Sequence, residues 1–225
     1  MMLLQVGSEG WVQDRYAFIL LAAVVVLIAI LGAVYFLYTS RVRRGFALPK
    51  LPPGSLILVE GPLDSRKGIV CSGFLKGVIE AGGKGAIISA TPSEHMPWFE
   101  KNLKKELLEN VEVVEAARNL TEMGVLVSDA LSWGAGAVYI PALSVLLVNE
   151  KLENIMEFVR FNSEKTRKKG AYLLFTIDPD ATAKANITSI EPLADCVVEL
   201  KTEDGEFVRI KKLPGAEADL EWKPL

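Results

Sequence analysis

The sequence is poor in metal-binding and disulfide-forming residues. It has a single histidine, His95, and only two cysteines, Cys71 and Cys196. With no cluster of cysteines and histidines, a zinc site would have no ligands. The two cysteines lie far apart in predicted core elements of one domain, which favours buried free thiols over a disulfide or a metal pair. We expect His95 on a helix surface.

The sequence also lacks an excess of positive charge. Its formal net charge is −3 and its isoelectric point is about 5.4. This balance argues against a general affinity for the phosphate backbone of nucleic acids, so no nucleic-acid partner is expected. The chain has no internal repeat and no low-complexity tract.

One long segment has no charge at all. From Ala17 to Tyr38 every residue is uncharged and most are apolar. At roughly 1.5 Å per residue, such a helix would span a bilayer core of about 30 Å. Residues 17–38 are therefore predicted to form a transmembrane helix. A cleaved signal peptide is the rival interpretation, but the apolar run is too long and no small-x-small cleavage site follows it.

The charges around this segment predict its orientation. Arg41, Arg43, Arg44 and Lys50 follow it, whereas Glu9, Asp14 and only one arginine precede it. The positive-inside rule then places the C-terminal part in the cytoplasm and the short N-terminus, residues 1–16, outside. The four basic residues suit anionic lipid headgroups. The protein is thus predicted to be single-pass in the cell membrane, with residues 39–53 as a basic juxtamembrane linker.

Residues 54–225 are predicted to form one α/β domain, because strand-like and helical runs alternate. Strands are expected at 56–60, 86–90, 111–114, 137–140 and 171–176, and helices at 68–81, 94–108, 120–133 and 151–169, followed by a short helix ending near 193. This alternation predicts a parallel sheet flanked by helices. Two further strands around Glu203-Asp204-Gly205 predict a C-terminal antiparallel hairpin.

Local signals support two of these helices. Thr91-Pro92-Ser93-Glu94 matches a capping box with proline in the first turn. The basic residues from Lys165 to Lys169 suit the negative C-terminal end of a helix that stops before Gly170.

The segment after the first strand resembles a phosphate-binding loop that has lost part of its chemistry. Such a loop follows a buried strand, has the pattern G-x-x-x-x-G-K-[ST] and opens a helix. Gly61 and Lys67 have the right spacing, but Arg66 replaces the second glycine and Gly68 replaces the hydroxyl that binds Mg²⁺. By itself this match is also compatible with an ordinary strand-to-helix turn. The possible anion or nucleotide site comprises Gly61, Ser65, Arg66, Lys67 and Gly68.

Four stretches together resemble the KaiC-like branch of the RecA superfamily, best known in archaea and cyanobacteria. They are LPPGSLILVEGPLDSRKG, EAGGKGAIISA, AVYIPALSVLL and LADCVVELKTEDGEFVRIKKLPG, and they occur in the family's order and spacing. The resemblance covers roughly residues 51–225 and implies a RecA-like parallel sheet with a C-terminal antiparallel hairpin. It also points to an archaeal source.

The sequence departs from this family at the positions that carry its ATPase chemistry. Pro141 stands where the family has a magnesium-shell aspartate, and Ala90-Thr91-Pro92 stands where the family has an acidic pair that polarises water. Near the end, Lys212 matches a basic residue that reaches a neighbouring subunit's γ-phosphate, but Pro214 replaces the accompanying arginine. Phosphoryl transfer depends on each of these parts, so we expect no catalytic residues and no hydrolysis.

These observations predict a membrane-anchored pseudo-ATPase that acts as a protein-interaction or regulatory module on the cytoplasmic face. Its expected partners are membrane lipid and a cytoplasmic or membrane protein, with a homo-oligomer possible through Lys212. No cofactor is required, although weak binding of ATP or another nucleotide is possible. The alternative is a membrane-attached ATP-binding switch whose site a partner completes. A recombinase-like machine is disfavoured by the acidic balance and the anchor.

Two further patterns have competing interpretations. Asp178, Asp180, Glu191 and Asp195 could suggest a metal cluster, but loop acids and acids at element ends are more often solvated or capping. We therefore expect no metal. Arg66 could also fill the phosphate position itself and pair with Asp64.

Overall fold

The computed structural model describes residues 26, 28–31, 48, 50–116, 119–141, 143–215 and 220–225. The chain divides into two compact units, Met1–Arg44 and Gly45–Leu225. In the first unit, residues 26 and 28–31 are helical, and their large apolar side chains are more than half exposed. The rest of the predicted span 17–38, together with Arg41, Arg43 and Arg44, lies outside the described residues.

Within those described ranges, no helix combines the length and the apolar character needed to cross a membrane.

The second unit contains eight strands in one sheet. The strands are β1 (Leu56–Glu60), β2 (Lys84–Ser89), β3 (Val111–Glu115), β4 (Ala135–Ile140), β5 (Tyr172–Ile177), β6 (Cys196–Thr202), β7 (Glu206–Lys212) and β8 (Lys223–Pro224). Their order across the sheet is β3-β2-β4-β5-β1-β6-β7-β8. The pairs from β3 to β6 are parallel, whereas β7 is antiparallel to both β6 and β8. The predicted parallel sheet with a C-terminal antiparallel hairpin is thus confirmed.

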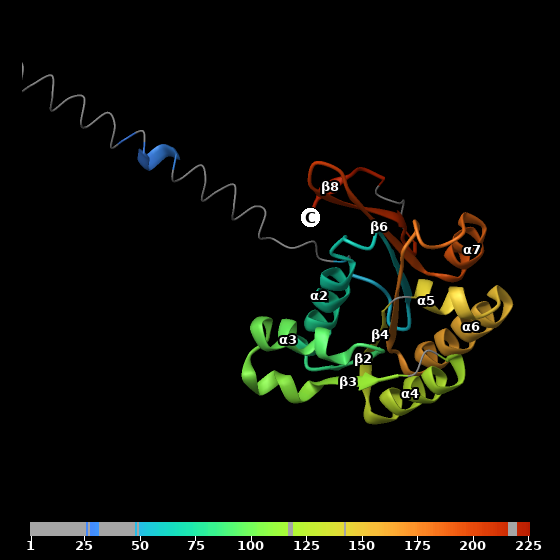
Figure 1. The fold of residues 1–225 in the computed structure, drawn as a ribbon. Coiled ribbons are helices and arrows are strands. Elements are labelled where there is room, and N and C mark those ends of the chain that lie inside the picture. The colour runs from blue at the N-terminus through green and yellow to red at the C-terminus, as the bar shows by residue number, and fades with distance from the viewer. Residues whose placement is uncertain are drawn as a thin grey trace, which may run out of the picture. The chain divides into compact units, whose positions relative to one another are not determined.

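The helices cover both faces of this sheet (Figure 1). They are α2 (Lys67–Glu80), α3 (Met96–Asn102), α4 (Leu120–Trp133), α5 (Leu143–Asn149), α6 (Leu152–Lys169) and α7 (Lys184–Ile190), with 3-10 helices η1 (Pro92–Glu94), η2 (Lys105–Asn110) and η3 (Glu191–Leu193). Right-handed crossovers explain which face each helix takes. The connections from β1 to β2 and from β2 to β3 run toward the β3 edge, so α2 and α3 share one face. Every later crossover runs the other way, which places α4 to α7 on the opposite face.

Two apolar layers hold these helices against the sheet. Successive strand residues point to opposite faces, and along β1 the side chains of Leu56 and Leu58 pack under α4 to α7, whereas those of Ile57 and Val59 pack under α2 and α3. All five residues of β1 are buried. This strand therefore lies in the centre of the core, and whatever follows it is held on a rigid support.

The predicted helices α2, α4 and α6 are confirmed, but the predicted helix 94–108 is wrong. It is broken into η1, α3 and η2, and Leu103 between the last two is extended (φ −110°, ψ 155°). The predicted capping box is also wrong, because the Thr91 side chain makes no cap hydrogen bond. A side-chain cap forms instead at α4, where Asn119 Oδ1 accepts the amide of Glu122 at 2.8 Å and Asn119 Nδ2 donates to the Glu122 carboxylate.

Two elements were not predicted. Helix α5 follows Pro141 in a run with too few polar residues to show an amphipathic period. Strand β8 pairs with β7 through Val208 and Lys223, and the amide of Leu225 donates to the carbonyl of Glu206 at 2.9 Å. The last described residues therefore lie along the hairpin, which turns at Asp204 (φ 49°) and Gly205 (φ 143°) as predicted.

Candidate functional site

The candidate site lies where neighbouring strands send their connections to opposite faces of the sheet. Strands β1 and β5 pair and end together at Glu60 and Ile177. The connection after β1 leads to α2 on one face, and the connection after β5 leads to α7 on the other. In open α/β sheets, ligands bind in the crevice at the carboxyl ends of strands at such a switch point. The loop from Gly61 to Arg66 lies at this position.

This loop is folded tightly on itself. The Gly61 amide donates to the Ile177 carbonyl at 3.1 Å, which continues the β1–β5 ladder. The amide and the hydroxyl of Ser65 both donate to the Pro62 carbonyl, at 3.1 and 2.7 Å. A Cβ atom on Gly61 would come within 2.5 Å of Ser65 Oγ, so a larger residue there would displace the Ser65 side chain from the Pro62 carbonyl.

Lys67 turns back into the loop. Its Nζ atom donates to the carbonyls of Gly61 at 2.8 Å and Pro62 at 2.5 Å. Burial lowers the pKa of Lys67, although the carboxylates of Asp178, Asp64 and Asp180 act in the opposite direction. The amine that a phosphate-binding loop would offer to a ligand is thus occupied by backbone oxygens of its own loop.

Arg66 is tied to the C-terminal hairpin. Its Nε atom lies 2.7 Å from the Glu206 carboxylate on β7, and its side chain is 57% exposed. The alternative partner considered from the sequence, Asp64, is therefore not the one found. The guanidinium is therefore held by the hairpin.

The first turn of α2 has open backbone donors. The amides of Ile69 and Val70 both donate to the Arg66 carbonyl. No side chain caps this end, and no acidic residue lies in its first turn. Among the described residues the amides of Lys67 and Gly68 have no hydrogen-bond partner, so this helix end keeps its partial positive charge.

Three buried polar side chains lie together on the α2 face of the sheet. The Tyr139 side chain, 1% exposed, hydrogen-bonds those of Thr176 on β5 and Cys71 on α2. Burial raises the pKa of both Tyr139 and Cys71. Both Cys71 and Cys196 are buried free thiols, as predicted, and the raised pKa keeps Cys71 protonated.

His95 is not on a helix surface, so that expectation was wrong. It is half-buried between η1 and α3, where its Nε2 atom lies 3.0 Å from Ser89 Oγ at the end of β2. Its ring lies edge-on to Tyr139, with ring centroids 6.1 Å apart. Burial lowers the pKa of His95 against the opposing effect of Glu94, so the ring is neutral at pH 7.

A buried carboxylate beside the loop was missed from the sequence. Glu60 ends β1, is 3% exposed, and accepts a hydrogen bond from Lys211 of β7 at 2.9 Å. Lys211 also donates to Glu191 of η3 at 2.5 Å. Burial raises the pKa of Glu60 to about 7, although Lys211 acts against it. The other oxygen, Oε1, is buried and has no hydrogen-bond partner. The only sequence signal was a charged residue at the end of an apolar strand.

The remaining predicted site residues lie apart from the loop. Lys50, in the predicted juxtamembrane linker, is exposed. The Lys212 amine donates to the carbonyls of Ala194 at 2.5 Å and Pro192 at 3.2 Å. These contacts hold it within its own chain, and its predicted reach toward a neighbouring subunit remains a prediction.

The acidic residues do not gather around a metal. The Asp178 carboxylate accepts the amides of Asp180 and Ala181, which forms a turn after β5. Asp195 lies at the opposite end of the sheet, where it accepts the Leu56 amide and pairs with Arg167. Within the described ranges, no three Cys, His, Asp or Glu residues are grouped so as to hold a metal ion.

The positions where the sequence was compared with the magnesium and water residues of the KaiC-like family lie at the same carboxyl end of the sheet. Ala90, Thr91 and Pro92 follow β2, and Pro141 follows β4. None of them carries a carboxylate. The carboxyl end of the sheet therefore presents open amides, hydroxyls and an imidazole. Residues 90–92 and 141 add no carboxylate for magnesium.

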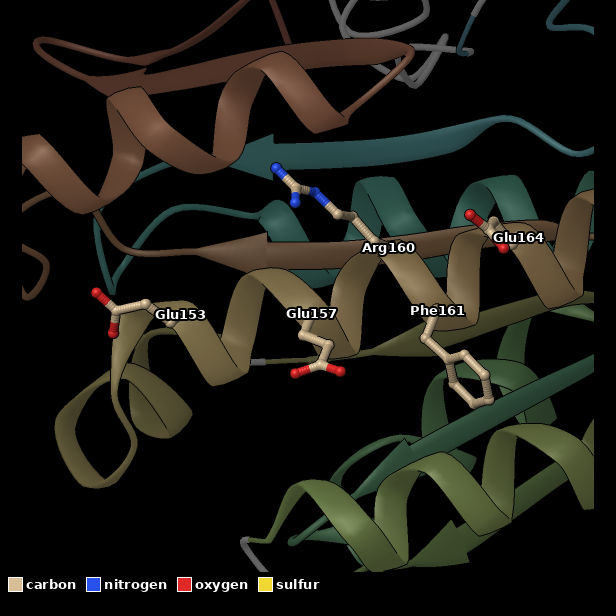
Figure 2. Close-up of a pocket in the computed structure, with 5 residues that line it drawn as sticks. All are labelled: Glu153, Glu157, Arg160, Phe161 and Glu164. Atoms are coloured by element: carbon tan, nitrogen blue, oxygen red, sulfur yellow. The ribbon is translucent and has the colours of Figure 1, made fainter.

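A hollow of about 440 Å³ runs along the outer face of α6. Glu153, Glu157, Arg160, Phe161 and Glu164 line it, and Figure 2 shows their side chains directed to different sides of the helix. Since one helix supplies all five residues, no second element closes over the hollow. We assign it no site.

The comparison with protein-family models identifies the domain. Residues 54–200, more than half of the chain, match the model described as a family of unknown function, DUF7504. The chain belongs to the DUF7504 family. None of the curated proteins compared with it matches. The DUF7504 match begins at the turn before β1 and ends in β6, so it includes the loop, Glu60 and His95.

Proposed function

We propose that this DUF7504 protein is a membrane-anchored, KaiC-like pseudo-ATPase that serves as a protein-interaction or regulatory module. The observation that carries the proposal is the position of Lys67. Its amine is bound to the Gly61 and Pro62 carbonyls and is partly desolvated. Two of the three N–H donors of the ammonium are thus already used, which leaves one for a ligand phosphate, and Gly68 supplies no hydroxyl to hold Mg²⁺.

The architecture supports the RecA-like part of the proposal. A central strand leads into the loop and α2, its neighbours are parallel, and an antiparallel hairpin closes the C-terminal side. This is the arrangement that the sequence resemblance implies. Rate enhancement in phosphoryl transfer comes from positioned charge, and the positions after β2 and β4 carry none.

The membrane part rests on residues 17–38. They are uncharged, and Val26, Ile28, Ile30 and Leu31 leave more than half of their surface exposed. Exposed large apolar side chains of this kind suit a lipid environment.

Protease added to sealed, right-side-out cells should leave residues 51–225 intact, because we place this domain in the cytoplasm. Its digestion without lysis would overturn that topology.

The chemical test uses the purified full chain with and without Mg²⁺. We expect no ATP turnover above buffer, and at most weak nucleotide binding that depends little on Mg²⁺. Lys67→Ala should weaken any such binding, whereas Lys76→Ala, which removes a partly exposed lysine paired with Glu80 on the same helix, should not.

One observation favours the alternative of a nucleotide switch. The amides of Lys67 and Gly68 remain open to an anion at the end of α2. Tight, Mg²⁺-dependent ATP binding, or ATP turnover abolished by Lys67→Ala, would favour the switch. Either result would require withdrawal of the pseudo-ATPase proposal.

A further inference from the structure

A pocket of about 320 Å³ opens between the first two turns of α2 and the η1–α3 segment. Ligand pockets in proteins run from about 300 to about 1,000 Å³, so this one is at the small end. It has room for a single ring with a short polar arm, but not for a nucleoside triphosphate.

The α2 wall of the pocket carries a hydroxyl without a partner among the described residues. Ser72 lines the pocket, is 4% exposed, and has no hydrogen-bond partner in the part of the chain that the structure describes. Helix serines usually donate to the carbonyl four residues earlier, and Ser128 and Ser132 on α4 do so at 2.9 and 2.8 Å. The Ser72 hydroxyl is therefore available to a ligand.

The same wall attracts negative charge. Gly68, one turn before Ser72, also lines the pocket, and its amide is one of the open donors at the start of α2. The helix end favours an anion, whereas the charge of the Arg66 guanidinium at the rim is already paired with Glu206. The exposed carboxylate of Glu94 on the opposite rim acts against this preference, so it should weaken the binding of a negatively charged ligand.

The remaining walls are apolar or neutral. Ile69 is 46% exposed although it is a large aliphatic residue. The half-buried indole of Trp98 faces it across the pocket and is braced edge-on by Phe99, with ring centroids 5.1 Å apart. The neutral ring of His95 lies beside them. Burial of Ile69 against a ligand would contribute the usual apolar gain of about 25 cal/mol per Å².

We infer that this pocket binds a small carboxylate with an aromatic or branched apolar body. The carboxylate would accept from the Gly68 amide and the Ser72 hydroxyl, and the body would lie between Ile69 and Trp98. This inference goes beyond the proposed function, because it uses neither Mg²⁺ nor the Lys67 amine.

The test uses the full chain in lipid nanodiscs and ligand-observed NMR, with empty nanodiscs as the blank. Phenylacetate is the probe, and phenylacetamide is its uncharged match. Phenylacetate should bind saturably and at least several-fold more tightly than phenylacetamide. Absence of saturable binding, or equal binding of the two compounds, would overturn the inference.

Variants locate the binding. Ser72→Ala should weaken phenylacetate binding about five-fold, the effect of one hydrogen bond, and Ser132→Ala on α4 should leave it unchanged. Glu94→Gln should tighten it, which provides a second arm if Ser72→Ala perturbs the fold. Unchanged affinity in both pocket variants would contradict the assignment. ATP turnover by the wild type would overturn the proposed function and leave this titration unaffected.

Discussion

At the scale of single residues, Glu60 is the least expected feature of the molecule. A carboxylate at the end of a buried strand is costly unless it is paired or protonated. Lys211 pairs with one of its oxygens, and burial raises its pKa to about 7. The group therefore titrates close to physiological pH and should couple the stability of the domain to pH.

We expect the stability of the protein to fall as pH rises from about 4.5 to about 7. In this window the folded state holds a proton on Glu60 that the unfolded state has lost, so raising the pH favours unfolding. The total effect is on the order of 3 kcal/mol. Glu60→Gln should remove this slope, measured as the thermal midpoint of the full chain in detergent across pH. The exposed Glu157→Gln serves as the control, and an unchanged slope in Glu60→Gln would contradict the assignment.

Gly61 and Gly73 should respond to alanine in opposite directions. A Cβ atom at Gly61 would meet Ser65 Oγ at 2.5 Å and Leu200 Cβ at 3.1 Å, so Gly61→Ala should destabilise by about 1–3 kcal/mol. At Gly73, within α2, nothing lies within 4 Å, and alanine should stabilise by about 0.5–1 kcal/mol through helix propensity. Thermal unfolding of both variants checks the difference in sign. Equal midpoints would show that the loop relaxes without cost.

At the scale of elements, the hydrogen bonds at helix N-termini determine where the helices begin. The sequence signal at Thr91 predicted a cap, but Thr91 contacts Ser89 instead and the helix is broken. The cap that forms is Asn119 at α4, which bonds Glu122 in both directions. The Thr91 pattern fails because β2 ends immediately before it, and the Ser89 hydroxyl competes for the same turn.

Loss of the Asn119 cap should be measurable. Asn119→Ala removes the acceptor for the Glu122 amide, so we expect a loss of about 1 kcal/mol in the free energy of unfolding. The comparison is Asn154→Ala on α6, whose side chain makes one exposed contact with Glu150 at 3.4 Å. A similar loss in both variants would mean that the cap contributes nothing specific.

At the scale of the whole molecule, the second unit should fold without the first. Gly45–Leu225 forms one compact unit with apolar layers on both faces of its sheet. The fragment 51–225 should therefore be soluble without detergent and unfold cooperatively, as checked by circular dichroism and thermal melting. If the fragment aggregates even as a fusion protein, a missing membrane contact or obligate partner would be indicated.

The sequence by itself determined the parallel sheet, its principal helices and the departures of the loop from the phosphate-binding pattern. These follow from local properties: the period of apolar residues, the glycines at the hairpin and at the end of α6, and the identity of the residues after each strand. Helix α5 was not predicted because the apolar run that forms it shows no amphipathic period. The long helix predicted at 94–108 was wrong because its breaks depend on packing.

Only the tertiary structure decided how the candidate site is arranged. The pairing of Glu60 with Lys211 joins residues separated by 151 positions, and Arg66 finds Glu206 on a distant strand. The turning of Lys67 onto its own loop depends on how β1 and β5 fix the Gly61 and Pro62 carbonyls. The pocket beside Ser72 depends on the approach of the η1–α3 segment. Such contacts form when the sheet brings distant segments together, and no local pattern in the chain encodes which partners will meet.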